Sequence, residues 1–255
     1  MQIQLALQLY TVRTPLAENF ARTCKQIAEI GYRYVELAGL HGHSVQAATQ
    51  MLADAGLSAI AAHESFESLD TDLPGVIERA RVFGYQYITL PWLEEHQRTA
   101  EGFLAAAKLL EHCESHPDAQ GLTFGYHHHA FEFDKLEDDP HGRRGFDIIL
   151  AQPSPSCEID TYWITAGGDD PIVWLDRLTG RVPVIHLKDM APAAQGETLG
   201  KIIELGRGTL DFSGILTAAR AAGTQYACVE QDEDWIDGDP LKSIKISYDY
   251  IAGLM

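Results

Sequence analysis

Short apolar runs rich in β-branched and aromatic residues alternate along the chain with longer stretches whose apolar residues recur every three or four positions. The short runs predict eight strands, at residues 3–10, 32–38, 57–63, 85–91, 121–127, 156–160, 182–187 and 225–230. The longer stretches predict helices over 16–31, 44–56, 74–84, 99–115, 171–180 and 212–223. Most of these helices end at a glycine, and a strand-then-helix rhythm of this kind is typical of a parallel sheet.

The number of repeats favours a closed barrel. Eight units in 255 residues give about 32 residues per unit, the size expected for a (β/α)8 TIM barrel. An open doubly wound sheet is the alternative, and it would normally carry a glycine-rich phosphate loop after the first strand. Here TVRTPLAEN follows that strand instead. We therefore expect residues 1–255 to form a single α/β domain with the TIM-barrel fold.

Composition narrows the class of protein further. With 45% hydrophobic residues the chain can bury a full core, and its net charge of −18 argues against binding nucleic acid. No apolar run approaches the roughly 18 residues of a membrane span, and MQIQLALQLYTVR resembles a first strand more than a signal peptide. Four scattered cysteines without a CxxC motif fit reduced thiols. These features predict a cytoplasmic protein that interacts with neither membranes nor nucleic acid.

Four residues with metal-binding side chains lie near the ends of predicted strands: His127, Asp160, His186 and Glu230. Active sites of TIM barrels lie at the C-terminal ends of the strands. Mixed nitrogen and oxygen ligands suit Zn²⁺, Mn²⁺, Co²⁺ or Fe²⁺ better than Ca²⁺. Buried, hydrogen-bonded polar residues are the alternative explanation. Four of them at such positions nevertheless favour one divalent metal ion, and His129 could replace His127 because residues two apart on a strand share a face.

Several segments resemble the xylose isomerase-like TIM barrels, also called the sugar phosphate isomerase/epimerase superfamily. They are GYHHHAFEF, EIDTYWITAGGDDP, GRVPVIHLKDM, ELGRGTLDFSGIL and YACVEQD. The resemblance spans nearly the whole chain and implies a metal-dependent enzyme that removes a proton next to the carbonyl of a ketose or keto-sugar. It also implies one divalent ion (Mn²⁺, Zn²⁺, Co²⁺ or Mg²⁺) as cofactor and a small carbohydrate as partner. The resemblance does not decide whether the protein forms a homo-oligomer.

The family's ligand positions fall on Asp160, His186 and Glu230, and Glu230 is also the expected catalytic carboxylate. The remaining ligand of the family is usually a glutamate at the end of the fifth strand, where this chain has His127. In the epimerases of the family, two metal-bound carboxylates on opposite faces of the substrate exchange its proton. Because a histidine makes that symmetric exchange harder, a lyase or hydratase (dehydratase) acting on an inosose or 3-keto-glycoside is the alternative. The family's endonuclease IV type is disfavoured by the acidic charge.

Further residues are expected around the metal. Lys188 shares a strand face with His186, so its ammonium either stabilises an enolate oxygen or forms a salt bridge with Asp160 or Glu230. Glu132 is expected to act as a general base or to orient one. The expected substrate contacts are His63, His129, Trp163 and Arg207. Since no cluster of basic residues accompanies Arg207, a neutral keto-sugar is favoured over a sugar phosphate.

Overall fold

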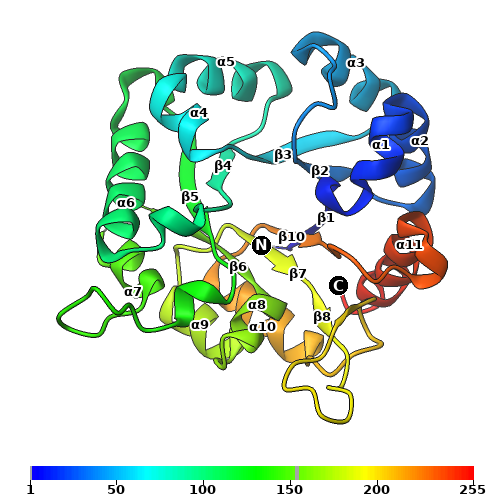
Figure 1. The fold of residues 1–255 in the computed structure, drawn as a ribbon. Helices are drawn as coiled ribbons and strands as arrows, with labels where there is room; N and C mark the ends of the chain where they lie inside the picture. The colour runs from blue at the N-terminus through cyan, green and yellow to red at the C-terminus, as the bar shows by residue number, and fades with distance from the viewer. Residues whose placement is uncertain (1, 153–154) are drawn as a thin grey trace.

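The computed structural model describes residues 2–152 and 155–255. Eight parallel strands form a closed barrel in the order β1-β10-β7-β6-β5-β4-β3-β2, as Figure 1 shows from one end of the barrel. Their bounds are β1 (Gln4–Gln8), β2 (Tyr34–Leu37), β3 (Ser58–His63), β4 (Tyr87–Leu90), β5 (Thr123–His127), β6 (Ser156–Asp160), β7 (Val184–Leu187) and β10 (Tyr226–Val229). Each strand lies inside its predicted range, and the TIM-barrel prediction is confirmed.

Helices surround the barrel on its outer side (Figure 1). They are α1 (Arg13–Glu18), α2 (Phe20–Ile30), α3 (Val45–Ala55), α4 (Phe66–Thr71), α5 (Leu73–Phe83), α6 (Ala100–Ser115), α7 (Gly145–Leu150), α8 (Thr161–Ala166), α9 (Pro171–Arg177), α10 (Phe212–Ala222) and α11 (Pro240–Ala252). The helix predicted over 16–31 is two helices. Asn19 separates them, because its extended backbone ends α1 and its side chain accepts a hydrogen bond from the Arg22 N–H at the start of α2.

The ends of the helix predicted over 44–56 are confirmed by its caps. Ser44 accepts a hydrogen bond from the Ala47 N–H and begins α3. Gly56 ends the same helix with φ of 75°, a left-handed conformation that favours glycine. The chain can therefore turn sharply from α3 into β3, which keeps the unit short enough for eight of them to close the barrel.

Two kinds of core hold the barrel. The larger core lies between the strands and the helices and contains residues such as Phe20, Phe124 and Phe146. A smaller apolar cluster fills one end of the barrel, where Tyr87 packs with Tyr226 at a ring separation of 6.2 Å. Towards the C-terminal ends of the strands the interior becomes polar. Because burying charged groups there is costly, this end of the barrel marks a functional site.

Two loops that follow strands of the barrel carry short structure of their own. Part of 191–208 forms β9 (Ile202–Ile203), which pairs antiparallel with β8 (Asp189–Met190). The loop 232–240 contains the short helix η5 (Ile236–Gly238). Among the helices of residues 2–152 and 155–255, none is long and apolar enough to cross a membrane.

Candidate metal centre

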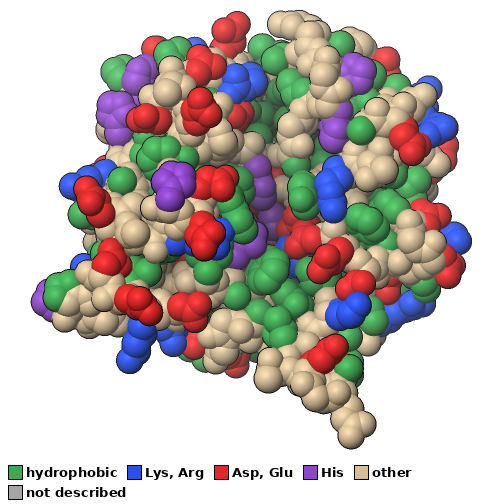
Figure 2. All heavy atoms as spheres, viewed as in Figure 1, with side chains coloured by type: hydrophobic (Ala, Val, Ile, Leu, Met, Phe, Trp, Pro, Cys, Tyr) green, Lys and Arg blue, Asp and Glu red, His purple; other side chains and the backbone are tan. Residues whose placement is uncertain are grey.

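The C-terminal ends of four strands bring His127, Asp160, His186 and Glu230 together. One nitrogen or oxygen atom from each lies within 4.8 Å of the corresponding atom of every other. We call these four residues the outer set. All four side chains are buried, and Figure 2 shows histidine side chains at the bottom of a hollow in the middle of this face. The strand register explains part of the arrangement, since Asp160 of β6 pairs directly with His186 of β7.

The chemistry of the outer set fits a divalent metal ion. Apart from charge contacts inside the cluster, four of its buried atoms have no hydrogen-bond partner among the described residues: His127 Nδ1, Asp160 Oδ2, His186 Nδ1 and Glu230 Oε2. Buried polar atoms without partners are rare in proteins. Two imidazole nitrogens and two carboxylate oxygens are ligands that Zn²⁺ and Mn²⁺ accept. The side chains could therefore hold such an ion.

Asp160 is held so that one oxygen faces the cluster. Its Oδ1 accepts a hydrogen bond from the Trp163 N–H at 2.9 Å and thereby begins α8. Its own N–H donates to His128 Nε2, and the ring of His128 packs against Phe133 and Phe146 on the outer side of the barrel. Burial lowers the pKa of His128 to about 3, so its ring stays neutral and accepts this bond. His128 is thus a packing residue that positions Asp160.

A carboxylate orients His186. Glu36 Oε2 lies 2.7 Å from His186 Nε2, while His186 Nδ1 faces Glu230 Oε2, also at 2.7 Å. A carboxylate on the far nitrogen of a metal-binding histidine fixes the ring and its tautomer. Burial alone would lower the pKa of His186, but the charges of Glu158, Glu230 and Glu36 outweigh it and raise this pKa well above its usual value.

Beneath the outer set lies a second layer of charged side chains. Glu158 comes two residues before Asp160 on the same face of β6, one step deeper in the barrel. Its Oε2 lies 2.8 Å from His63 Nε2, 3.4 Å from His127 Nδ1 and 3.3 Å from His186 Nε2. His63, which the sequence predicts as a substrate contact, is therefore paired with carboxylates in this layer.

The carboxylates and imidazoles of this layer shift one another's pKa values. Burial alone would lower the pKa of His63, but the carboxylates of Glu36 and Glu158 raise it to about 10. Burial raises the pKa of Glu36, but the charges and hydrogen bonds of His63 and His186 outweigh it and lower that pKa. The layer is therefore a strong binding environment for positive charge, whether protons or a cation.

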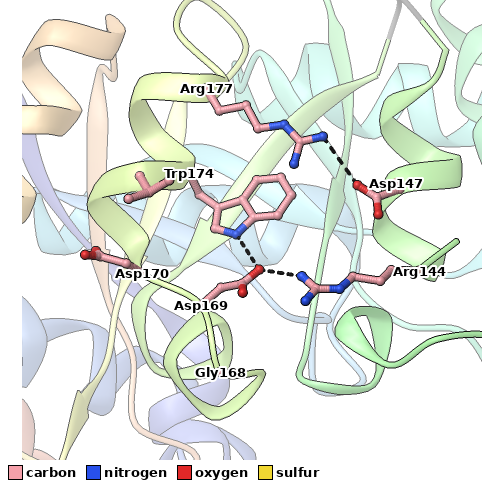
Figure 3. Close-up of a pocket in the computed structure, with 8 residues that line it drawn as sticks. Arg144, Asp147, Gly168, Asp169, Asp170, Trp174 and Arg177 are labelled. Atoms are coloured by element: carbon pink, nitrogen blue, oxygen red, sulfur yellow. Dashed lines mark hydrogen bonds and ion pairs between the residues drawn. The ribbon is translucent and has the colours of Figure 1, made fainter.

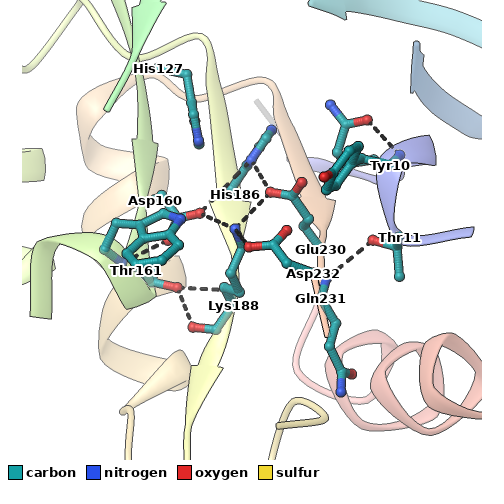
Figure 4. A network of polar contacts seen from close by, with 12 residues as sticks. Tyr10, Thr11, His127, Asp160, Thr161, His186, Lys188, Glu230, Gln231 and Asp232 are labelled. Atoms are coloured by element: carbon teal, nitrogen blue, oxygen red, sulfur yellow. Dashed lines mark hydrogen bonds and ion pairs between the residues drawn. The ribbon is translucent and has the colours of Figure 1, made fainter. Parts of the chain in front are cut away.

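Lys188 forms a salt bridge with both Asp160 and Glu230, which is one of the two roles that the sequence predicts for it. Its Nζ lies 3.0 Å from Asp160 Oδ2, 3.0 Å from Glu230 Oε2 and 2.9 Å from Asp232 Oδ2, as Figure 4 shows. The side chain is 1% exposed. Burial opposes the charged form, but these carboxylates raise the pKa of Lys188 well above its usual value. The ammonium thus neutralises two ligand atoms of the outer set and stands next to the place where an ion would bind.

Glu132 does not face this cluster. Its Oε1 accepts a hydrogen bond from the Tyr126 hydroxyl at 2.8 Å, and its Oε2 accepts one from the His129 N–H at 2.7 Å. Tyr126 points into the core between barrel and helices, opposite to His127. With both oxygens engaged, Glu132 holds the turn that carries His129. Its expected role as a general base, or as the group that orients one, stays a prediction. Burial raises its pKa to about 7.

His129 and Trp163 form an aromatic wall beside the cluster. Their ring centroids are 5.1 Å apart, and Trp92 packs edge-on against His129 at 4.8 Å. The Trp163 ring lies 5.4 Å from Lys188 Nζ. The structure therefore brings both residues next to the cluster, at positions where a substrate contact would be made.

The structure places Arg207, an expected substrate contact, outside the cluster. Its Nη1 is 3.5 Å from Glu204 Oε2, and the other oxygen of Glu204 accepts a hydrogen bond from Ser243 of α11. The adjacent Gly206 and Gly208 donate their N–H groups to Asp189. Arg207 is consequently part of a turn fixed against α11, and its ion pair is with Glu204 rather than with the cluster.

Asp232 is a site residue that sequence reasoning missed. Asp232 follows Glu230 by two residues. Residues two apart in an extended chain point to the same side, and this spacing, which linked Lys188 to His186, would also have indicated Asp232. Burial raises its pKa to about 6, against the opposing charge of Lys188. Its side chain is 23% exposed, so it reaches solvent at the mouth of the site.

A pocket of about 350 Å³ lies between α7 and α9, and no residue of the cluster lines it (Figure 3). Its charged groups neutralise one another: Arg144 pairs with Asp169 at 2.6 Å, and Arg177 pairs with Asp147 at 3.3 Å. The Trp174 ring nitrogen also donates to Asp169. With these groups paired, the pocket offers little to a charged ligand, and the buried cluster remains the candidate site.

Comparison with solved structures confirms the fold over the full chain. A sugar phosphate isomerase/epimerase from Parabacteroides distasonis aligns with a TM-score of 0.81 and 22% identity, covering 98% of each chain. The IolI protein with a bound zinc atom aligns at 0.72 and 15%, covering 99% of this chain and 98% of that one. The probable 3-DHS dehydratase AsbF from Bacillus anthracis aligns at 0.70 and 15%, covering 98% and 99%. Searches of protein-family models and of curated proteins find no match.

Proposed function

We propose that the protein is a divalent-metal-dependent sugar isomerase or epimerase acting next to the carbonyl of a ketose or keto-sugar. The observation that carries this proposal is the convergence of four buried ligand atoms at the strand ends where TIM barrels carry their active sites. Among the described residues, these atoms have only charge contacts with one another, with Glu158 and with Lys188. The ion, as Mn²⁺, Zn²⁺, Co²⁺ or Mg²⁺, would supply Lewis-acid polarisation of the carbonyl when bound. Zinc in the IolI structure, which shares the fold, supports this assignment.

We assign the proton transfer to Glu230. It has the largest exposed fraction of the four ligands, 5%, and so stands nearest to an entering substrate. Lys188, 3.0 Å from its Oε2, would turn its ammonium to the substrate oxygen on which negative charge develops. That movement would also free the Glu230 carboxylate to accept the proton.

The substrate would enter past aromatic side chains. Trp163 stands beside Lys188, and Trp92 and Tyr10 are exposed at 42% and 43%. Flat aromatic faces at a site mouth stack on the apolar faces of sugar rings. Small, neutral carbohydrates therefore fit the site better than phosphorylated ones, because Lys188 is already paired with three carboxylates.

A lyase or dehydratase is the second candidate, and one observation favours it. His127 takes the place where a second carboxylate would face the substrate, while Glu230 and Asp232 stand together beside Lys188. Elimination needs one base and one acid. Glu230 would act as the base, and Asp232, whose pKa is raised to about 6, would deliver the proton to a leaving hydroxyl.

Solvent deuterium exchange separates the two reactions. We expect the Mn²⁺-loaded protein, incubated in D₂O with ketoses, inososes and 3-keto-glycosides, to place deuterium on the carbon next to the carbonyl of at least one substrate. Product mass otherwise unchanged supports the isomerase or epimerase, whereas loss or gain of water or of an aglycone supports the lyase. Chelator-treated protein is the control. The absence of exchange with every substrate would contradict both candidates.

A further inference from the structure

Two groups of possible metal ligands both contain His127 and His186. The Nε2 atom of His186 is paired with Glu36, which leaves its Nδ1 for the outer set, whereas His127 Nδ1 can bind only one ion at a time. The first group is the outer set, and the second lies one step deeper in the barrel. Without His127, the outer set keeps Asp160, His186 and Glu230. Three protein ligands with an open position are the number found in catalytic zinc sites. His127 is thus available to the deeper group.

We propose that the barrel binds a second divalent cation through an inner set formed by His63 Nε2, His127 Nδ1 and Glu158 Oε2. Glu158 Oε2 lies 2.8 Å from the His63 nitrogen and 3.4 Å from the His127 nitrogen. Two ligands of a tetrahedral zinc ion, each about 2.0–2.1 Å from the metal, are about 3.3 Å apart. The inner set therefore needs little rearrangement to bind zinc.

Burial and unpartnered atoms support the inner set. The side chains of Glu158 and His127 are 2% and 3% exposed. Glu158 Oε1 and Glu36 Oε1 have no hydrogen-bond partner within the described ranges, and Glu36 Oε1 lies 3.2 Å from His63 Nε2, where it could complete the coordination. Glu36 Oε2 accepts the proton of His186 Nε2 at 2.7 Å. Each ion would thus have its own imidazole nitrogens, and no ring would have to bridge them.

The charges in this part of the barrel also favour more than one divalent ion. Five carboxylates lie in the two layers: Asp160, Glu230 and Asp232 contact the Lys188 ammonium, and Glu36 and Glu158 contact His63. With neutral imidazoles, one divalent ion would leave two negative charges uncompensated. Uncompensated buried charge is strongly unfavourable. A second divalent ion would neutralise these two remaining negative charges.

Metal counting tests the proposal independently of any catalytic reaction. The whole chain is saturated with Zn²⁺, freed of excess metal by gel filtration, and its zinc content is measured by mass spectrometry. We expect two ions per chain in the wild type and one in each of Glu158→Gln, His63→Ala and Asp160→Asn. The double variant Asp160→Asn with Glu158→Gln should hold none.

Controls keep these outcomes interpretable. His112→Ala removes an exposed histidine of α6 and should retain two ions. Circular dichroism identifies any variant that fails to fold, and His63→Ala, which changes a side chain already 14% exposed, serves if Glu158→Gln does not fold. One ion per chain in the saturated wild type, or two ions that persist in both inner-set variants, would overturn the second site. An Asp160→Asn variant with unchanged zinc would instead count against the outer set.

Discussion

Asp160→Asn is expected to remove the outer-set ion and nearly all activity. Asparagine keeps an oxygen for the hydrogen bond from the Trp163 N–H, so α8 should still begin at this residue. It loses the negative charge of Oδ2, which faces Lys188 and the other ligands. Because Lewis-acid polarisation is worth several kcal/mol, kcat should fall at least about 10³-fold. Metal content should fall by one ion per chain.

Asp170→Asn is the matched control for this variant. Asp170 also caps a helix, since its side chain accepts a hydrogen bond from the Ile172 N–H at the start of α9, but it is exposed and lies outside the cluster. It should change stability slightly and leave metal content and kcat close to wild type. An Asp160→Asn variant that keeps its full metal content would show that Asp160 is not a ligand.

Lys188→Met should weaken the metal-free protein and slow the reaction. Removing the ammonium leaves Asp160, Glu230 and Asp232 as close, buried carboxylates without a cation. Breaking a buried ion pair in this way costs about 3–5 kcal/mol, so the metal-free variant should melt well below wild type. A bound divalent ion replaces the missing charge, so added metal should restore most of the melting temperature.

The same variant should lower kcat by about 10²–10³-fold even when loaded with metal, because the enolate oxygen loses its charged donor. KM should change much less. Lys201→Met is the matched control, since Lys201 pairs with Asp234 but its side chain is 67% exposed. A metal-loaded Lys188→Met enzyme with wild-type kcat would leave the lysine a purely structural role.

The strands and most helix ends could be predicted because both depend on local signals. The β-type runs and the glycine and serine caps can each be recognised from a few neighbouring residues in the sequence. The short helices α4, α7 and α8 were not predicted, since six residues contain too few apolar positions to define a helical period. α11 was not predicted, although its 13 residues begin at a proline.

The site was predictable as far as each residue belonged to an extended strand. Alternation along a strand correctly put His127, Asp160 and His186 inside the barrel. Strand alternation does not apply to Glu132, because β5 ends at His127 and the chain continues into the short helix Phe131–Phe133.

The inner layer depends on the stagger between neighbouring strands. Glu158 aligns with Val184 of β7, and this register decides that Glu158 lies beneath His186. A single sequence does not state how far one strand is shifted against the next. The pairing of His63 with Glu158 therefore became visible only in the folded barrel.

Anomalous diffraction from crystals grown with Mn²⁺ or Zn²⁺ tests the central claim most directly, because it places the ion without reference to activity. We predict a strong anomalous peak within coordination distance, about 2.0–2.2 Å, of Asp160 Oδ2, His186 Nδ1 and Glu230 Oε2. Crystals of metal-saturated protein that show Lys188 still bridging Asp160 and Glu230, with no peak among these three atoms, would contradict it.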